Sequence, residues 1–174
     1  MGYNIIIVYI ISENIFKFKE SDFMEQIIKF MHKFLGDDSE FTDKELETYK
    51  LALTHSSNGS LVNHNQRLAF IGDSVLRLII REHLYEQHPD WAKGQLSDKA
   101  KGTETKLGIE QDENFAPIAI ELKVLEYMDI QNQTFEVDDI TPNAEAFEAL
   151  FGAVYLTRGL GEAKRLAKMY VLKE

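Results

Sequence analysis

Asn65–Leu76, with the sequence NQRLAFIGDSVL, decides the fold together with a second stretch, Asn143–Leu156, which reads NAEAFEALFGAVYL. Both stretches lack proline and carry apolar residues at the spacing of a helix. Each also contains an interior glycine, Gly72 or Gly152, which costs about 1 kcal/mol relative to alanine. Close approach of two backbones would offset that cost. The sequence therefore predicts two helices that cross at their glycines.

The apolar residues of the two helices are expected to bury against each other. They comprise Leu68, Ile71, Val75, Leu78 and Ile79 on the first helix, and Phe147, Leu150, Phe151 and Val154 on the second. The pattern extends the first helix over Gln66–Gln87. It predicts further helices over Met24–Leu35, over Asp43–Leu53 with a capping box of Thr42 and Glu45, and over Asn114–Met128. The predicted elements make an all-α fold.

Three acidic residues meet if the helices cross at the glycines. Asp73 then lies near Glu145 and Glu148, which are three residues apart on one helical face. Three crowded carboxylates repel each other unless a cation lies between them, and their hard oxygen atoms suit Mg²⁺. The alternative is that these residues are solvated, as most Asp and Glu side chains are. The paired helices and their glycines favour the metal site.

The chain resembles the ribonuclease III family in three stretches, LTHSS (Leu53–Ser57), Asn65–Leu76 and AEAFEALFGAVYL. The family's central motif runs Asn-Glu-Arg-Leu-Glu-Phe-Leu-Gly-Asp-Ala/Ser-Val-Leu, and its later motif runs Ala-Asp-Ala-Phe-Glu-Ala-Leu-x-Gly-Ala-x-Tyr. The similarity covers residues 24–174 and leaves residues 1–23 as an N-terminal extension. It implies the all-α ribonuclease III endonuclease-domain fold, which dimerises, without the double-stranded-RNA-binding domain of longer members.

The chain departs from the family motifs at three acidic positions. Gln66 and Ala69 stand where the central motif has glutamate, and Glu145 stands where the later motif has aspartate. The resemblance implies that Asp73, Glu145 and Glu148 bind Mg²⁺, with Mn²⁺ as an alternative, and that Asp73 and Glu148 are catalytic. Ala69 cannot bind a metal, and Gln66 could only orient water. Ala69 is expected on the rim of the polar site, one turn before Asp73.

Basic residues near this site are candidates for contact with RNA phosphates. They are Arg67, Arg77 and Arg81 on one stripe beside Asp73, and Lys93, Lys99 and Lys101 in the segment KGQLSDKAKGTETK, whose GQLS resembles the family's Gly-Glu-Leu-Ser. A solvated charged face is the alternative explanation of both groups. His55 could act as a ligand or base, but we favour a histidine that orders its loop.

Phe70 lies off the apolar stripe, on the side of the helix that carries Arg67 and Ser74. A monomer would gain little from an aromatic residue there. Family members use an aromatic residue at this place in their dimer joint, so we expect a homodimer with Phe70 in its interface.

Composition limits the partners. The chain has 174 residues, a net charge of −10 and no cysteine. The acidic balance disfavours nucleic acid, although metal ions offset acids that are concentrated at a nuclease site. The apolar run near the N-terminus is too short to span a membrane and lacks the basic start of a signal peptide. We therefore expect a cytoplasmic protein with no membrane partner.

The resemblance implies a Mg²⁺-dependent endoribonuclease that cleaves double-stranded RNA, weakened by Ala69 in place of a glutamate ligand. In such an enzyme the metal polarises the phosphate and activates water. One alternative is a catalytically inactive relative that binds RNA or associates with the ribosome. Another is an all-α protein-interaction module, which only the net charge of −10 favours.

Overall fold

A computed structural model describes residues 21–174 except 59 and 132–134, and the chain forms two compact units that divide between Glu40 and Phe41. In the first unit residues 21–35 are helical, which confirms the helix predicted from Met24. Phe30 and Phe34 stack one turn apart, with ring centroids separated by 6.1 Å. The boundary at residue 24 stays a prediction, because residues 1–20 lie outside the described part.

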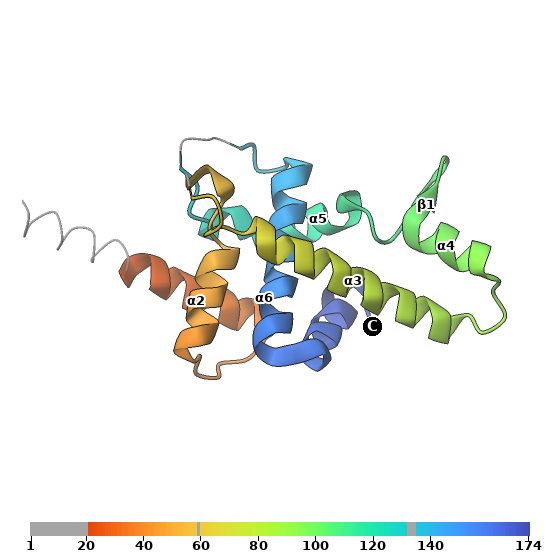
Figure 1. Ribbon diagram of the computed structural model, residues 1–174, viewed down its shortest axis with the longest axis horizontal. Coiled ribbons are helices and arrows are strands. Elements are labelled where there is room, and N and C mark those ends of the chain that lie inside the picture. The colour runs from red at the N-terminus through yellow and green to blue at the C-terminus, as the bar shows by residue number, and fades with distance from the viewer. Residues whose placement is uncertain (1–20, 59, 132–134) are drawn as a thin grey trace, which may run out of the picture. The chain divides into compact units, whose positions relative to one another are not determined.

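The second unit is mostly helical (Figure 1). Its elements are α2 (Asp43–Ala52), α3 (Gln66–Gln87), α4 (Lys93–Lys101), β1 (Gly102–Thr103), β2 (Lys106–Leu107), α5 (Asp112–Leu122) and α6 (Ile140–Ala167), with 3₁₀ turns at Ser56–Asn58 and Val124–Tyr127 and a π-helical turn at Lys168–Leu172. The strands pair as a two-residue antiparallel hairpin. The all-α prediction is confirmed apart from this hairpin. No helix in the described part of the chain is long and apolar enough to cross a membrane.

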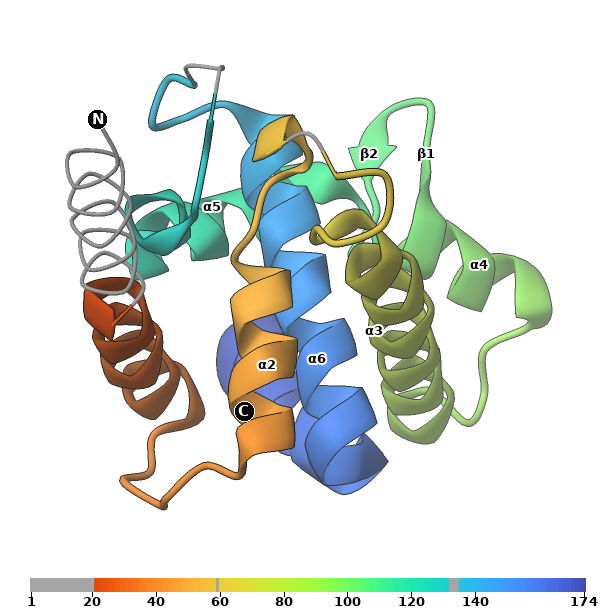
Figure 2. The ribbon, with the colours of Figure 1, turned by 60° about the vertical axis from the view of Figure 1, so that its left-hand side comes forward.

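Helix α6 is the central element, packing against α2, α3 and α5 (Figure 2). Its interior half buries a nearly continuous series of side chains, among them Phe147, Phe151 and Val154. α3 begins at Gln66 and ends at Gln87, as the apolar pattern predicted. α4 and the hairpin lie on the side of α3 that faces away from α2, as both ribbon views show.

The apolar face of α3 differs from its prediction at one residue. Leu78 is 53% exposed, whereas Leu76, Ile79 and Ile80 are buried. The close contact with α6 centres the buried face on the line through Gly72, and successive residues of a helix are rotated by about 100°. Leu78 therefore points away from α6, and its assignment to the apolar stripe was wrong.

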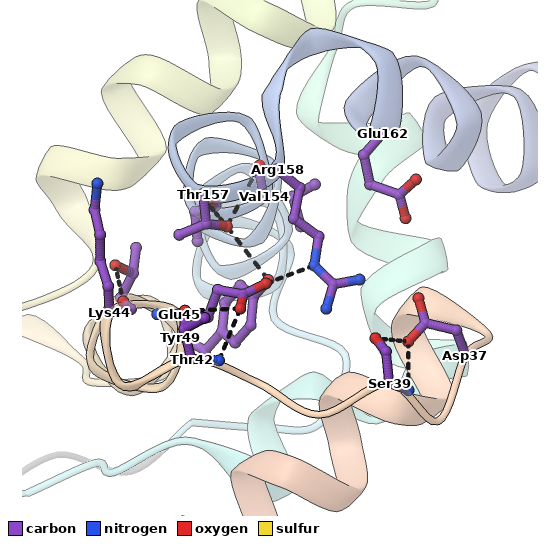
Figure 3. Close-up of polar contacts among 12 residues, drawn as sticks. Asp37, Ser39, Thr42, Lys44, Glu45, Tyr49, Val154, Thr157, Arg158 and Glu162 are labelled. Carbon is purple, nitrogen blue, oxygen red and sulfur yellow. Dashed lines mark hydrogen bonds and ion pairs between the residues drawn. The ribbon is translucent and has the colours of Figure 1, made fainter.

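The start of α2 is fastened by polar contacts (Figure 3). Thr42 and Glu45 form the predicted capping box, with the Glu45 amide donating to Thr42 Oγ1 and the Thr42 amide donating to the Glu45 carboxylate. Arg158 of α6 donates to Glu45 Oε1 over 2.7 Å. Burial acts to raise the pKa of Glu45, but the hydrogen bonds from Thr42 and Arg158 hold it below its usual value. The predicted capping box is therefore confirmed, and the bond from Arg158 links α2 to α6.

The helix predicted over Asn114–Met128 is shorter than expected. α5 begins at Asp112 and ends at Leu122, because Lys123 adopts the left-handed conformation with φ of 62°. A 3₁₀ turn, Val124–Tyr127, follows. The spacing of apolar residues does not show that a lysine adopts the left-handed conformation, so the predicted helix continued past Lys123.

Candidate active site

Two glycines set the geometry of the site. A Cβ atom on Gly72 would lie 1.7 Å from the carbonyl oxygen of Glu148, and one on Gly152 would lie 2.1 Å from the carbonyl oxygen of Leu68. The backbones of α3 and α6 are therefore in direct contact, as the sequence predicted. Because Asp73 follows Gly72 directly, this contact brings it beside the turn of α6 that carries Glu148.

An open cleft of about 510 Å³ lies over this crossing. It is lined by Gln66, Ala69, Phe70, Asp73 and Arg77 of α3, by Asp112 of α5 and by Thr141, Glu145 and Glu148 of α6. The structure thus brings the three expected carboxylates to one cleft. It adds Asp112, which the sequence reading had not singled out.

The cleft disfavours negative charge. Burial, followed by repulsion from the carboxylates of Asp73, Asp112 and Glu145, raises the pKa of Glu148 to about 8, against the lowering effect of Arg77. Burial also raises the pKa of Asp73, against the lowering effect of Arg77. The acids therefore repel one another in the absence of a cation, as expected for a site that is completed by a bound ion.

Asp73 holds an atom that the protein does not satisfy. Its Oδ1 lies 2.7 Å from Nε of Arg77, one turn further along α3. This oxygen is buried, and no well-aligned hydrogen bond to it is formed among the described residues. Arg77 acts on the Asp73 carboxyl through its charge first and through side-chain hydrogen bonding second, and both lower its pKa. A buried carboxylate oxygen in this condition is available to a cation.

The donors present fit a hard divalent cation. The charged ligands that the cleft offers are carboxylate oxygens, which suit Mg²⁺ or Mn²⁺ better than softer metals. Among the residues that the structure describes, no three His, Asp or Glu side chains are already gathered closely enough to hold an ion. Binding would therefore require side-chain rotation and displacement of Arg77 from Asp73. Mg²⁺ tolerates few protein ligands, because it readily keeps several waters.

Ala69 lies deeper than expected. It lines the cleft, but it is only 4% exposed, so it forms part of the floor and not the rim. The reason is its place on α3: it shares the buried face with Leu68 and Gly72. Gln66, one turn earlier, is exposed at the mouth of the cleft.

The expected RNA-binding residues divide into two groups. Arg67 is exposed on α3, and Lys93, Lys99 and Lys101 are exposed on α4. Arg77 and Arg81 are instead held in ion pairs with acids. Arg81 donates two hydrogen bonds, of 2.6 and 2.7 Å, to the buried carboxylate of Glu110, and this pairing raises the pKa of Arg81. Contact between Arg81 and RNA stays a prediction, although Glu110 binds two nitrogens of its half-exposed guanidinium in this structure.

His55 orders its loop. It is buried, its Nδ1 accepts a hydrogen bond of 3.0 Å from the Ser57 amide, and its own amide donates to the carbonyl of Asp129. Its ring packs edge-on against Phe135. Burial lowers the pKa of His55, which favours the neutral ring. These contacts support the structural interpretation over a role as ligand or base.

Phe70 stands at the edge of the cleft and is 75% exposed. It also lines a second hollow of about 560 Å³ with Leu61, Arg67 and Ile71. Leu61 is 93% exposed. This surface, here called the Phe70 patch, consists of Leu61, Arg67, Phe70 and Ile71. Its exposed apolar area matches the expected place of a dimer contact.

The ribonuclease-III-like family model matches residues 44–174. Two curated relatives are ribonuclease 3 of a Nitratiruptor species, 37% identical over 149 residues, and ribonuclease 3 of Thermobifida fusca, 39% identical over 122 residues. These alignments cover 83% and 66% of this chain, but only 60% and 48% of the relatives, so the chain spans about half the length of the curated relatives that it matches.

A solved structure of similar fold is the nuclease domain of ribonuclease III from Campylobacter jejuni, described for structural flexibility in its region of dimer formation. It superposes with a TM-score of 0.70 and 29% identity, covering 84% of this chain and 96% of that domain. The fold, the crossing helices and the family match agree. This chain belongs to the ribonuclease-III-like family.

Proposed function

We propose that the protein is a Mg²⁺-dependent endoribonuclease that cleaves double-stranded RNA. The observation that carries this proposal is the crossing at Gly72 and Gly152, which gathers Asp73, Glu145 and Glu148 around one cleft. Three acids on two helices in contact are costly to maintain without a cation. The relatives named ribonuclease 3 support the reaction class.

The roles of the residues follow from their positions. Asp73, Glu145 and Glu148 would hold Mg²⁺, or Mn²⁺ in its place, and Gln66 at the mouth would orient water. When bound, the ion supplies polarisation of the phosphodiester and activation of water. Arg77 pairs with Asp73 in this structure, and if a cation neutralised that carboxylate, the Arg77 guanidinium would be available to an RNA phosphate. Arg67 and the lysines of α4 extend this basic surface.

A second function, RNA binding without cleavage, is favoured by one observation, the alanine on the floor of the cleft at position 69. Two assays separate the possibilities. Cleavage of a duplex RNA across a range of Mg²⁺ concentrations supports the enzyme. A gel shift of the same duplex in Ca²⁺ without any cleavage in Mg²⁺ supports a binding protein. If neither cleavage nor a gel shift is observed, the remaining possibility is a protein-interaction module.

Ala69→Glu is expected to lower the Mg²⁺ concentration required for cleavage. The new carboxylate would enter the cleft one turn before Asp73 and add an oxygen ligand. We expect the midpoint of the Mg²⁺ titration to fall by about tenfold, within the range typical of altered metal-site residues. The measurement is the initial rate of duplex cleavage against Mg²⁺ concentration. An unchanged midpoint in a folded variant would contradict a role for this position in metal binding.

Phe70→Ala is expected to convert a homodimer into a monomer. An exposed aromatic side chain at the centre of an interface typically contributes about 2 kcal/mol or more to association. Light scattering should show the wild type at twice the 20.0 kDa chain mass and the variant moving toward that mass on dilution. Tyr85→Ala, which removes another exposed aromatic residue of α3, is the matched control. A wild type that remains at 20.0 kDa at micromolar concentration, whatever the dilution, would contradict the dimer.

A further inference from the structure

Asp112 is a fourth carboxylate of the cleft and comes from a different element than the other three. It is the first residue of α5 and lines the cleft with Asp73, Glu145 and Glu148. Its charge acts on both Asp73 and Glu148, since it raises the pKa of each. Asp112 therefore shares one cleft with the expected ligands, although the side chains would have to rotate to reach a common cation.

The segment before Asp112 is held along α3 by several contacts. The Arg81–Glu110 pair fixes it two turns beyond Asp73, and Glu110 also donates its amide to the carbonyl of Ala100. The side chain of Asn114 donates to the carbonyl of Gly108 over 2.6 Å, which closes the start of α5. These contacts hold Asp112 at the cleft.

The β1–β2 hairpin brings Asp112 toward the cleft because the backbones of Gly102 and Gly108 are in close contact. A Cβ atom on Gly108 would lie 2.1 Å from the amide nitrogen of Gly102, and Gly102 itself has φ of 87°. The segment from β2 to α5 therefore folds back tightly on the end of α4. In this way Asp112, which follows β2 closely in the chain, becomes part of one wall of the cleft.

A simpler explanation of Asp112 is the favourable interaction of an acid with the first turn of a helix. Glu113 shares that turn and would benefit in the same way, yet among the described residues it is not part of the cleft lining. The two neighbours therefore separate the explanations: a helix-end effect predicts similar behaviour for both, and a ligand role predicts a difference.

We propose that Asp112 takes the place of the carboxylate missing at Ala69, as a ligand of the divalent cation or of its waters. This rests on the proposed metal-dependent function. Ala69 on α3 and Asp112 on α5 line the same cleft, so a carboxylate lost from one wall is replaced by one from another. With Asp112 the cleft holds four carboxylates, those of Asp73, Asp112, Glu145 and Glu148.

The test measures Mn²⁺ binding to the full chain by electron paramagnetic resonance of the free ion, with thermal unfolding of the metal-free and Mn²⁺-loaded forms. Asp112→Asn is compared with Glu113→Gln as matched control. We expect Asp112→Asn to weaken Mn²⁺ binding by about tenfold or more and to lose most of the metal-induced rise in melting temperature. The metal-free form should be no less stable than the wild type. Glu113→Gln should leave Mn²⁺ binding unchanged.

The double variant Ala69→Glu/Asp112→Asn adds a compensation test, because restoring a carboxylate on α3 should recover the Mn²⁺ affinity lost on α5. If the wild type binds Mn²⁺ and Asp112→Asn binds it equally well, the role of Asp112 is overturned and the proposed metal site stands. If the metal-free Asp112→Asn and Glu113→Gln forms lose stability alike with Mn²⁺ affinity intact, Asp112 serves the helix end. A wild type that binds no Mn²⁺ overturns both proposals.

Discussion

Gly72→Ala is expected to lower the free energy of unfolding by roughly 3 kcal/mol or more, the upper part of the range for overpacked cores. The added methyl group would lie 1.7 Å from the carbonyl oxygen of Glu148, and that atom belongs to the backbone of α6, which cannot rotate away. The helices must therefore separate. Separation also moves Asp73 from Glu148, so metal binding should weaken with stability.

Chemical denaturation measures this effect, and Gly161→Ala provides the matched control. Gly161 lies in α6 just beyond the kink at Gly159, where a second helical stretch begins, and a Cβ atom there meets no atom within 4 Å outside its own helical turn. The same substitution should there be neutral or stabilising by up to about 1 kcal/mol, because alanine favours a helix. Equal effects at the two glycines would contradict the direct backbone contact.

Glu148→Gln is expected to abolish cleavage and to stabilise the metal-free protein at alkaline pH. The amide keeps the volume of the side chain and removes the charge that a hard cation needs. It also removes the repulsion among Glu148, Asp73, Asp112 and Glu145. A loss of activity together with a gain in stability distinguishes a functional carboxylate from a structural one.

The pH dependence of this gain follows from the pKa of Glu148. The folded protein keeps the proton on Glu148 up to about pH 8, whereas the unfolded chain releases it near the ordinary glutamate pKa of 4.5. Unfolding therefore releases a proton between these values, and wild-type stability falls as the pH rises through the window. At about 1.4 kcal/mol per pKa unit, less an allowance for partial exposure, the variant should be more stable by roughly 2–4 kcal/mol above pH 8.

Urea denaturation of the metal-free proteins at pH 5 and pH 9 measures the difference. The two proteins should be closer in stability at the lower pH, where the folded wild type carries the proton. Glu47→Gln, on the exposed surface of α2, controls for the substitution itself and should show no such pH dependence. A Glu148→Gln protein that is less stable than the wild type at pH 9 would show that the carboxylate anchors the fold.

The crossing of α3 and α6 could be predicted because its signal is local. An interior glycine destabilises a helix, and close packing of a second backbone against it offsets that cost. Two apolar helices that each contain such a glycine are therefore expected to cross at those glycines. The same reasoning located Asp73, Glu145 and Glu148 at one cleft. Their roles in metal binding remain predictions that the substitutions above test.

Asp112 could not be predicted, since its place depends on contacts across the fold. Nothing in the acidic stretch after β2 shows that Arg81 pairs with Glu110 or that Gly102 and Gly108 touch. The exposure of Leu78 was missed for a related reason: the pattern shows that a face is apolar, but the neighbouring helix decides where that face is centred.

The most direct test of the account is the rate at which the wild-type protein cleaves a duplex RNA as the Mg²⁺ concentration is raised. We predict no cleavage without a divalent ion and a rate that increases and saturates with Mg²⁺. Glu148→Gln should show no cleavage at any concentration under the same conditions. Wild-type protein that leaves the duplex intact throughout the Mg²⁺ titration, or cleaves it equally well in a chelator, would contradict the account.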